Sequence, residues 1–239
     1  MDLNGKVAII TGGGRGIGRA IALDLAREGC HLVLSSRGRQ ELSEVAAAAS
    51  AMGVEVVEAP LDLSIEANVT ALVEQALAKF RVIDILINNA GVIFVEPFLE
   101  ATLERWDQTM NLNLRGVFLL SQQVLRQMAT RRSGYIINIS STVALGVPPQ
   151  VASYGVSKCG MVGLSQALYE EAKQHGVKVS TIYPGITDTR MVRDLDLPTT
   201  PDQWMLPEDI SYCVMFLLKQ SDRMIVKDLV PWSTSYDRI

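Results

Sequence analysis

The chain has 239 residues, and 48% of them are hydrophobic, which is enough for one sizeable core and a single domain spanning residues 1–239. Its net charge of −4, from 22 basic and 26 acidic residues, provides no strongly positive surface for nucleic acid or an anionic membrane. No signal pattern precedes the first apolar run and no apolar run is long enough to span a bilayer, so we expect a cytoplasmic protein that binds neither nucleic acid nor membrane.

Apolar runs alternate with helical patterns along the whole chain. Runs that predict strands lie at 7–10, 31–35, 54–58, 83–88, 135–139, 177–183 and 225–230. Patterns that predict helices lie between them, first through Ile21 and Leu25 and then at about 42–52, 65–80, 103–131, 153–175 and 207–219. This alternation predicts the α/β class: a Rossmann-type, doubly wound parallel sheet of about seven strands with helices on both faces.

A glycine-rich stretch, VAIITGGGRGIG at residues 7–18, joins the first predicted strand to the first helix. Glycines at the start of a helix let backbone N–H groups approach an anion, so the loop suits a pyrophosphate. The pattern G-x-G-x-x-G fits in no register, whereas T-G-x-x-x-G-x-G fits through Thr11, Gly12, Gly16 and Gly18. The loop therefore predicts a dinucleotide site, with a purely structural turn as the alternative.

The end of the second predicted strand indicates which dinucleotide is preferred. An acid at this place would bind a ribose 2′-hydroxyl, but the sequence has Ser36 and Arg37, and Arg15 lies in the glycine loop. Guanidinium and hydroxyl groups suit a 2′-phosphate, so we favour NADP(H) over NAD(H). The alternative is that these arginines are solvated loop charges.

Tyr154 and Lys158 lie one turn apart at the start of a predicted helix and share a face. A neighbouring ammonium group lowers the pKa of a phenol, although the effect is large enough for catalysis only in a partly desolvated cleft. The pair predicts a proton-donating tyrosine if other motifs accompany it.

Such motifs follow most of the predicted strands, and together they make the chain resemble the short-chain dehydrogenase/reductase family over nearly its whole length. They are Thr11 to Gly18, Asp62-Leu63, Asn88-Asn89-Ala90-Gly91, Asn113, Ser141, Tyr154-x-x-x-Lys158, and Pro184-Gly185 with Thr187 and Thr189. The resemblance implies that Tyr154 gives a proton to a carbonyl oxygen and that Ser141 hydrogen-bonds the same oxygen. It also implies that Lys158 lowers the tyrosine pKa and binds the nicotinamide ribose, and that Asn113 holds a water in a proton relay. Implied cofactor contacts come from Gly12, Gly14, Arg15, Gly16, Ile17, Gly18, Ser36, Arg37, Asp62, Leu63, Asn89, Ala90, Gly91, Tyr154, Lys158, Pro184, Gly185, Thr187 and Thr189.

These roles predict an NADPH-dependent oxidoreductase that reduces the carbonyl of a small ketone, aldehyde or quinone to an alcohol. One alternative is a reductase of 3-oxoacyl thioesters carried by acyl carrier protein or coenzyme A. A second is a regulator that binds NADP without catalysis. The substrate, its stereochemistry and the physiological direction stay open.

Several other features carry weaker expectations. Residues 189–206 follow a strand end and are rich in apolar side chains, so they are a candidate substrate lid or a surface loop packed on the core. The cysteines Cys30, Cys159 and Cys213 predict buried thiols without disulfides, and His31 and His175 have no partners at metal-ligand spacing, so no metal site is expected.

The carboxyl end departs from the family pattern. Many members finish with a segment similar to V-D-G-G that helps to pack a tetramer, whereas this chain has Asp228-Leu229-Val230-Pro231-Trp232. The family's usual dimer surfaces are the long predicted helix and the Tyr154 helix. The resemblance therefore implies a homodimer and leaves a homotetramer open.

Overall fold

A seven-stranded parallel sheet forms the centre of the computed structural model, which describes residues 2–195 and 199–235. Its strands are β1 (Val7–Thr11), β2 (His31–Ser35), β3 (Val56–Ala59), β4 (Ile85–Asn88), β5 (Gly134–Ile139), β6 (Val177–Ile182) and β7 (Asp228–Leu229). Their order across the sheet is β3-β2-β1-β4-β5-β6-β7. The chain thus starts at a central strand, winds to one edge, returns, and winds to the other, so the predicted doubly wound fold is confirmed.

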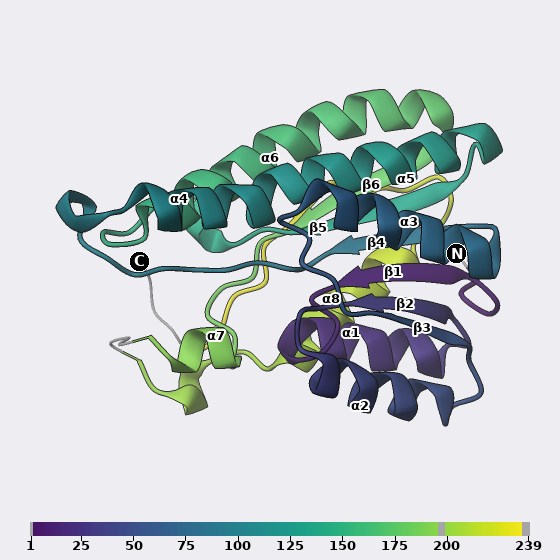
Figure 1. The fold of residues 1–239 in the computed structure, drawn as a ribbon, viewed down its shortest axis with the longest axis horizontal. Helices are drawn as coiled ribbons and strands as arrows, with labels where there is room; N and C mark the ends of the chain where they lie inside the picture. Colours follow the sequence, from purple (N-terminus) through teal and green to yellow (C-terminus); the bar gives the residue numbers. More distant parts are fainter. Residues whose placement is uncertain (1, 196–198, 236–239) are drawn as a thin grey trace.

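Two layers of helices cover the sheet (Figure 1). One layer holds α1 (Gly16–Arg27), α2 (Arg39–Ser50) and α8 (Pro207–Leu218), and the other holds α3 (Glu66–Phe80), α4 (Leu103–Met110), α5 (Val117–Arg131) and α6 (Ala152–Ala172). A short helix, α7 (Arg190–Arg193), lies beyond the sheet below α4 in the view of Figure 1. The layers bury one apolar cluster on each face of the sheet.

The apolar runs in the sequence become fully buried strands because helices cover both faces of the sheet. All residues of β1, β4 and β5 are buried. The helices instead bury one side, as in α1, where Ile21 and Leu25 pack into the core while Arg19 is exposed.

The structure differs from the predicted elements at four places in particular. The predicted long helix at 103–131 contains a π-helical segment, Asn111–Gly116, between α4 and α5. The strand expected at 54–58 is shifted to Val56–Ala59, and the strand expected at 83–88 begins at Ile85. The strand expected at 225–230 pairs with β6 only through Asp228 and Leu229.

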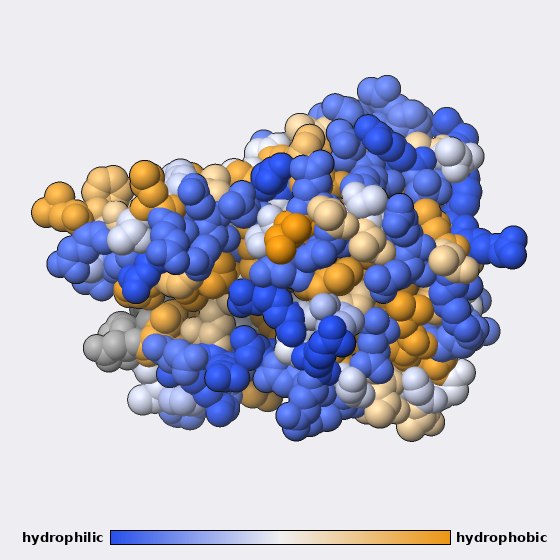
Figure 2. Space-filling model, in the orientation of Figure 1, coloured by the Kyte–Doolittle hydropathy of each residue, from blue (hydrophilic) through white to orange (hydrophobic). Residues whose placement is uncertain are grey.

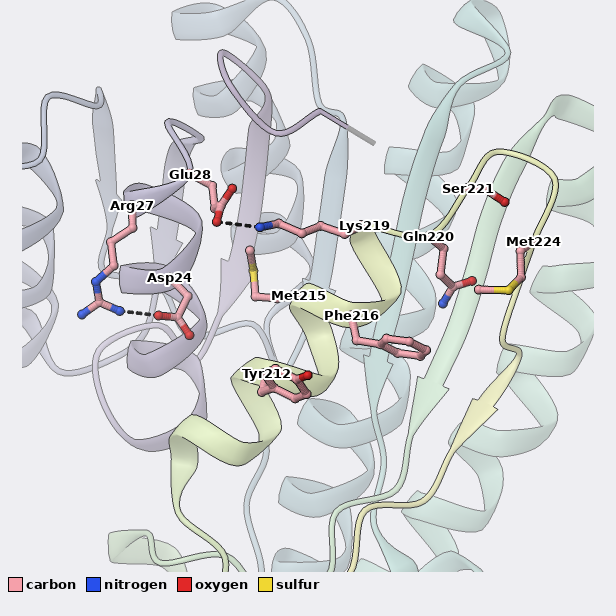
Figure 3. Close-up of a pocket in the computed structure, with 10 residues that line it drawn as sticks. All are labelled: Asp24, Arg27, Glu28, Tyr212, Met215, Phe216, Lys219, Gln220, Ser221 and Met224. Carbon is pink, nitrogen blue, oxygen red and sulfur yellow. Dashed lines mark hydrogen bonds and ion pairs between the residues drawn. The ribbon is translucent and has the colours of Figure 1, made fainter.

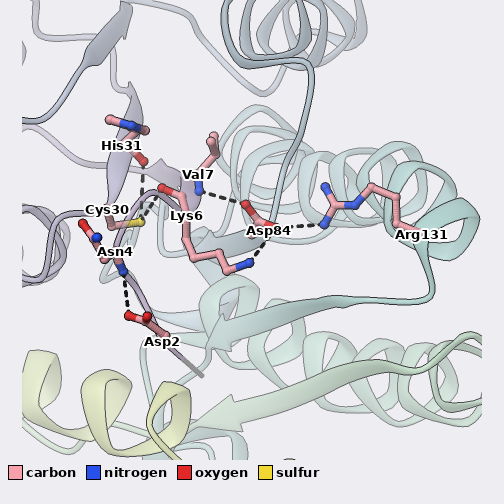
Figure 4. Close-up of polar contacts among 8 residues, drawn as sticks. All are labelled: Asp2, Asn4, Lys6, Val7, Cys30, His31, Asp84 and Arg131. Carbon is pink, nitrogen blue, oxygen red and sulfur yellow. Dashed lines mark hydrogen bonds and ion pairs between the residues drawn. The ribbon is translucent and has the colours of Figure 1, made fainter.

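At the amino edge of the sheet, Asp84 fixes the start of β1 (Figure 4). Its carboxylate, only 6% exposed, accepts hydrogen bonds from the backbone N–H of Val7 at 3.0 Å and from Arg131 Nη2 at 2.8 Å. Lys6 Nζ lies 3.8 Å from the same carboxylate. The buried negative charge is therefore paired with two cations and joins β1 to the end of α5.

An open pocket of about 600 Å³ lies between α1 and α8 (Figure 3). Arg27 and Glu28 line it at the end of α1, and Lys219 Nζ lies 2.7 Å from Glu28 Oε1 across it. The glycine loop lies at the other end of α1. The pocket is therefore separate from the predicted cofactor site.

The cysteines and histidines are placed only partly as predicted. Cys30 is buried and Cys213 is half-buried, but the expected burial of Cys159 is wrong, because this thiol lies on an outward-facing side of α6. His31 is structural: its Nδ1 accepts a hydrogen bond from the backbone N–H of Glu55 at 3.0 Å, and its ring stacks on Phe80.

None of the helices formed by residues 2–195 and 199–235 is long and apolar enough to cross a membrane. Across the same two ranges, no three His, Cys, Asp or Glu side chains gather as potential metal ligands.

Candidate active site

The glycine loop between β1 and α1 forms a cradle of bare backbone at a helix N-terminus. Gly12 and Gly16 have φ angles of +68° and +51°, which favour glycine. A Cβ on Gly18 would lie 2.2 Å from the carbonyl oxygen of Gly12, and one on Gly14 would lie 3.0 Å from Ser36 Oγ. The first turn of α1 has no acidic residue. The loop therefore fits the pyrophosphate of a dinucleotide.

Thr11 joins this loop to the chain that follows β4. Its Oγ1 accepts hydrogen bonds from the backbone N–H groups of Asn89 at 2.9 Å and Ala90 at 3.0 Å. In return, Asn89 Nδ2 donates to the carbonyl oxygens of Thr11 at 2.9 Å and Gly12 at 3.3 Å. The contacts hold the carboxyl ends of β1 and β4 together, where the strand order reverses and where doubly wound folds bind their ligands.

The residues expected around the adenosine half gather at the ends of β2 and β3. Arg37 Nη1 lies 3.9 Å from Asp62 Oδ2, and Asp62 Oδ1 also accepts a hydrogen bond from the backbone N–H of Ser64 at 3.0 Å. Leu63 is buried, and its carbonyl oxygen lies against Gly116. The Ile17 side chain packs against the core, so only its backbone can serve a ligand.

Arg15 has a partner that the sequence did not indicate. Its Nη1 lies 3.5 Å from Glu41 Oε1 in the first turn of α2, and Arg190 Nη1 of α7 lies 3.8 Å from the same oxygen. Glu41 looks like an ordinary first-turn acid in the sequence, and only the folded chain places it between two arginines.

Ser141, Tyr154 and Lys158 meet at the carboxyl end of β5. Ser141 follows the strand, and its side chain hydrogen-bonds that of Tyr154 at the start of α6. Lys158 Nζ lies one turn further along, 5.6 Å from the centroid of the Tyr154 ring, and donates to the carbonyl oxygen of Ile139 at 2.8 Å. All three side chains are at most 9% exposed, so they interact in a largely desolvated environment.

The burial sets the proton affinities of this group. Desolvation raises the pKa of Tyr154, and the hydrogen bond with Ser141 opposes this change. Desolvation also lowers the pKa of Lys158 from 10.5 to about 8. The expected lowering of the tyrosine pKa by Lys158 is therefore not found, because burial outweighs the other influences on the phenol.

Asn113 lies in the π-helical segment and is fully buried. Its Oδ1 accepts from the backbone N–H of Val92 at 2.9 Å, and its Nδ2 donates to Val92 O at 2.9 Å and to Ser157 Oγ at 3.1 Å. These bonds fix the loop after Gly91, beside which Lys158 Nζ also lies. Ser157, which the sequence motifs did not single out, thus links Asn113 to the Tyr154 helix. π-Helical turns of this kind are frequent at functional sites.

The loop after β6 closes the site on the other side. Pro184 O accepts a hydrogen bond from the backbone N–H of Thr142 at 3.0 Å, directly after Ser141. Thr187 Oγ1 donates to Gly185 O at 3.0 Å, and Thr189 Cγ2 would lie 3.1 Å from a Cβ on Gly16. Figure 2 shows a hollow in this face between α4 and α7 with apolar surface inside it.

The structure thus brings the predicted residues to one edge of the sheet. The residues expected around the adenosine half of the cofactor lie at the ends of β2 and β3, and the group around Tyr154 lies at the ends of β5 and β6. The expected lid, residues 189–206, borders the same edge, and its residues 196–198 lie outside the described part of the chain.

The sequence model of the short chain dehydrogenase family matches residues 6–199. The chain is 36% identical over 227 residues to a 2-dehydro-3-deoxy-D-gluconate 5-dehydrogenase of Dickeya dadantii, covering 90% of this chain and 89% of the relative. It is 32% identical over 230 residues to a 3-oxoacyl-[acyl-carrier-protein] reductase of Chlamydia trachomatis, covering 92% of each.

Solved structures of short-chain oxidoreductases and dehydrogenases are also similar to this chain. A metagenomic short-chain oxidoreductase in complex with NADP has a TM-score of 0.86 and 32% identity, over 98% of this chain and 100% of that one. An NAD+-bound xylitol dehydrogenase has a TM-score of 0.87 and 28% identity, over 96% and 98% of the two chains. From the matched sequence, the doubly wound sheet and these relatives, the chain belongs to the short-chain dehydrogenase family of oxidoreductases.

Proposed function

We propose that this oxidoreductase uses NADPH to reduce the carbonyl group of a small ketone, aldehyde or quinone to an alcohol. The observation that carries the proposal is the buried group of Ser141, Tyr154 and Lys158 at the carboxyl edge of the sheet, next to Gly91 and to the loop that holds Pro184. A buried hydroxyl pair beside a dinucleotide cradle can polarise a carbonyl and donate a proton to it.

The residues divide the chemistry between them. Ser141 and Tyr154 donate hydrogen bonds to the carbonyl oxygen, and the Tyr154 hydroxyl proton moves to that oxygen as the alcohol forms. A bound NADPH supplies the hydride that the carbonyl carbon receives. Burial keeps the phenol protonated, as a proton donor requires, by raising its pKa.

Lys158 restores the proton to Tyr154. Its pKa of about 8 lets the ammonium group release and regain a proton near neutral pH, which a lysine with the ordinary value of 10.5 does far less readily. Asn113 positions this relay by fixing Val92 and Ser157 around it. A lower tyrosine pKa for the reverse reaction requires another nearby positive charge, which an oxidised nicotinamide carries.

The preference for NADP(H) rests on Arg15, Arg37 and Ser36. Both guanidinium groups are exposed, and each lies beside a carboxylate: Arg15 is 3.5 Å from Glu41 and Arg37 is 3.9 Å from Asp62, so a 2′-phosphate would compete with these carboxylates for the arginines. Solved relatives contain either NADP or NAD+, so family membership alone does not decide which of the two cofactors this chain prefers. We expect Arg37→Asp to weaken NADPH binding by at least about tenfold more than NADH binding, measured by cofactor fluorescence titration. Equal changes for the two cofactors would contradict the assignment.

The test of the activity is NADPH consumption with a panel of ketones, aldehydes, quinones and 3-oxoacyl thioesters. Tyr154→Phe keeps the ring but removes the proton, so turnover should fall by at least about 100-fold. The relative from Chlamydia trachomatis makes a thioester reductase the second candidate, and faster turnover of acetoacetyl thioesters than of free ketones would favour it. Cofactor binding without turnover of any compound would favour a regulator.

We also propose a homodimer through α5 and α6, with a homotetramer as the alternative. Phe118 of α5 and Val156 of α6 are each 45% exposed, and Cys159 is exposed one turn after Val156. Large exposed apolar side chains on neighbouring helices are typical of an interface. Light scattering should give twice the mass of one chain, and Cys159 should react with a thiol reagent faster on dilution. A monomer at micromolar concentration would contradict the proposal.

A further inference from the structure

The C-terminal segment continues along β6 beyond the two residues of β7. Backbone N–H groups of Thr181 and Tyr183 donate to the carbonyl oxygens of Lys227 and Leu229, each at 2.8 Å. The next bond, from Gly185 N to Pro231 O at 3.2 Å, lies past the end of the sheet. Figure 1 shows this yellow segment running beside the green one toward α7. These three backbone hydrogen bonds therefore bring the C-terminal segment to the loop that closes the candidate site.

Trp232 packs on that loop where Gly185 has no side chain. Its Cδ2 would lie 3.8 Å from a Cβ on Gly185, and Met205 Cε would lie 3.6 Å from the same point. Trp232 is 39% exposed, whereas Met205 is buried. The indole therefore lies against the bare backbone of Gly185, which Met205 also approaches, and part of the indole surface stays exposed.

The second half of the candidate lid is tied to both the loop and the tail. Met205 N donates to Ile186 O at 3.0 Å, and Asp188 N donates to Met205 O at 2.8 Å. The Ser233 hydroxyl donates to Gln203 O. Residues 203–205 are thus held from two sides, which favours a fixed wall over a hinged flap.

The wall presents apolar and aromatic groups. Trp204 is oriented by a hydrogen bond from its Nε1 to Thr199 Oγ1 at 2.9 Å, and it stands next to Met205. The two arginines of α7 are already paired, Arg193 Nη2 with Asp188 Oδ2 at 2.7 Å and Arg190 with Glu41 at 3.8 Å. The paired carboxylates offset the positive charge of these arginines, so this part of the site is not dedicated to an anionic substrate, whereas a flat apolar group gains contact with the wall.

We propose that Trp232, together with Trp204, determines substrate specificity and selects carbonyl compounds with an aromatic group next to the carbonyl. The inference rests on the proposed carbonyl reduction, and it assigns a substrate class to that same site. It also gives the atypical C-terminal sequence a function in substrate recognition.

The test compares an aryl methyl ketone, acetophenone, with a small polar ketone, dihydroxyacetone. Trp232→Ala should lower kcat/KM for acetophenone by about tenfold or more relative to dihydroxyacetone. Trp232→Phe keeps an aromatic face and should retain most of the preference. Tyr212→Ala is the control, because Tyr212 is an exposed aromatic residue in the separate pocket between α1 and α8 (Figure 3). An unchanged ratio in Trp232→Ala would overturn the proposal, as would an equal loss for both ketones that Trp232→Phe does not rescue.

A binding measurement separates this inference from the proposed activity. Saturation-transfer NMR can detect acetophenone on the protein with NADP+ present, without turnover. If the wild type reduces neither ketone in a Tyr154-dependent manner, the proposed activity fails, and binding then decides the inference. Binding that is lost in Trp232→Ala and retained in Trp232→Phe supports the aromatic wall. Equal binding to all three proteins, or none to the wild type, refutes it.

Discussion

Lys158→Met is expected to stabilise the protein while removing its activity, because the wild type keeps a buried ammonium group at neutral pH. Lys158 is 4% exposed, and burial lowers its pKa from 10.5 to about 8. At ~1.4 kcal/mol for each pKa unit, holding the charged form in the folded chain costs about 3 kcal/mol. The methionine has no charge and a similar length, so it does not carry this cost.

The substitution also removes a contact. Lys158 Nζ donates to Ile139 O at 2.8 Å, and losing this hydrogen bond costs roughly 1–2 kcal/mol. The net gain in the free energy of unfolding is therefore about 1–2 kcal/mol at pH 7. For a domain of this size, each kcal/mol corresponds to roughly 2–4 °C in Tm.

The pH dependence identifies the cause of the gain. Between pH 8 and pH 10.5 the unfolded chain binds a proton at Lys158 that the folded chain does not, so wild-type stability rises with pH across this window. Below pH 8 both states hold the proton, and the full cost of burial is present. The advantage of Lys158→Met should therefore be largest at pH 7 and should shrink toward pH 9.5.

Chemical denaturation of both proteins at pH 7, 8.5 and 9.5 measures this difference, and NADPH turnover measures activity in the same samples. We expect turnover to fall by at least about 100-fold. A stability gap that does not vary with pH would refute the reasoning from the buried charge. A variant less stable than the wild type at pH 7 would show that the contact with Ile139 outweighs desolvation.

Three further predictions concern other parts of the chain. Gly18→Ala should abolish cofactor binding in a fluorescence titration, because its Cβ would lie 2.2 Å from Gly12 O. The control is Gly163→Ala on α6, whose Cβ would meet no neighbouring atom of the described chain within 4 Å, and this variant should bind the cofactor normally. Asp84→Asn should lower the free energy of unfolding, measured by urea denaturation, by roughly 1–3 kcal/mol, because it weakens the ion pair with Arg131. Since this pair lies at the edge of the sheet opposite the candidate site, kcat should stay unchanged, and a loss of kcat at equal stability would contradict the prediction. Cys30 should stay unmodified by a thiol reagent at pH 8 until the protein is denatured, because burial raises its pKa to about 12; rapid labelling of native protein, detected by peptide mass analysis, would count against it.

The sequence predicted the fold and the location of the site for one physical reason. Apolar runs mark buried parallel strands, and the carboxyl ends of such strands meet at one edge, so polar motifs that follow them converge there. Ser141, Asn89 and Gly185 each follow a different strand and lie at the same edge of the structure. Their proposed roles stay predictions until the variants are measured.

Helical periodicity gave no indication of two other features. The π-helical segment adds a residue to a turn without disturbing the apolar pattern on either side, so the long helix around Asn113 looked regular. Cys159 was expected to be buried because an unpaired cysteine is usually a small buried apolar residue. Residue type does not tell which side of a helix the sheet covers, and this thiol lies on an outer side of α6.

Contacts between separate loops are the least predictable part of the site. Glu41 meets Arg15 and Arg190 because α2 and α7 both begin next to the glycine loop. Trp232 reaches Gly185 because three successive backbone bonds extend the tail along β6. Neither contact has a periodic signature, since each depends on the path of two chain segments in space. Substrate choice depends on such contacts, so residues that distinguish members of one family have to be sought where loops meet and not in the strand-end motifs that the members share.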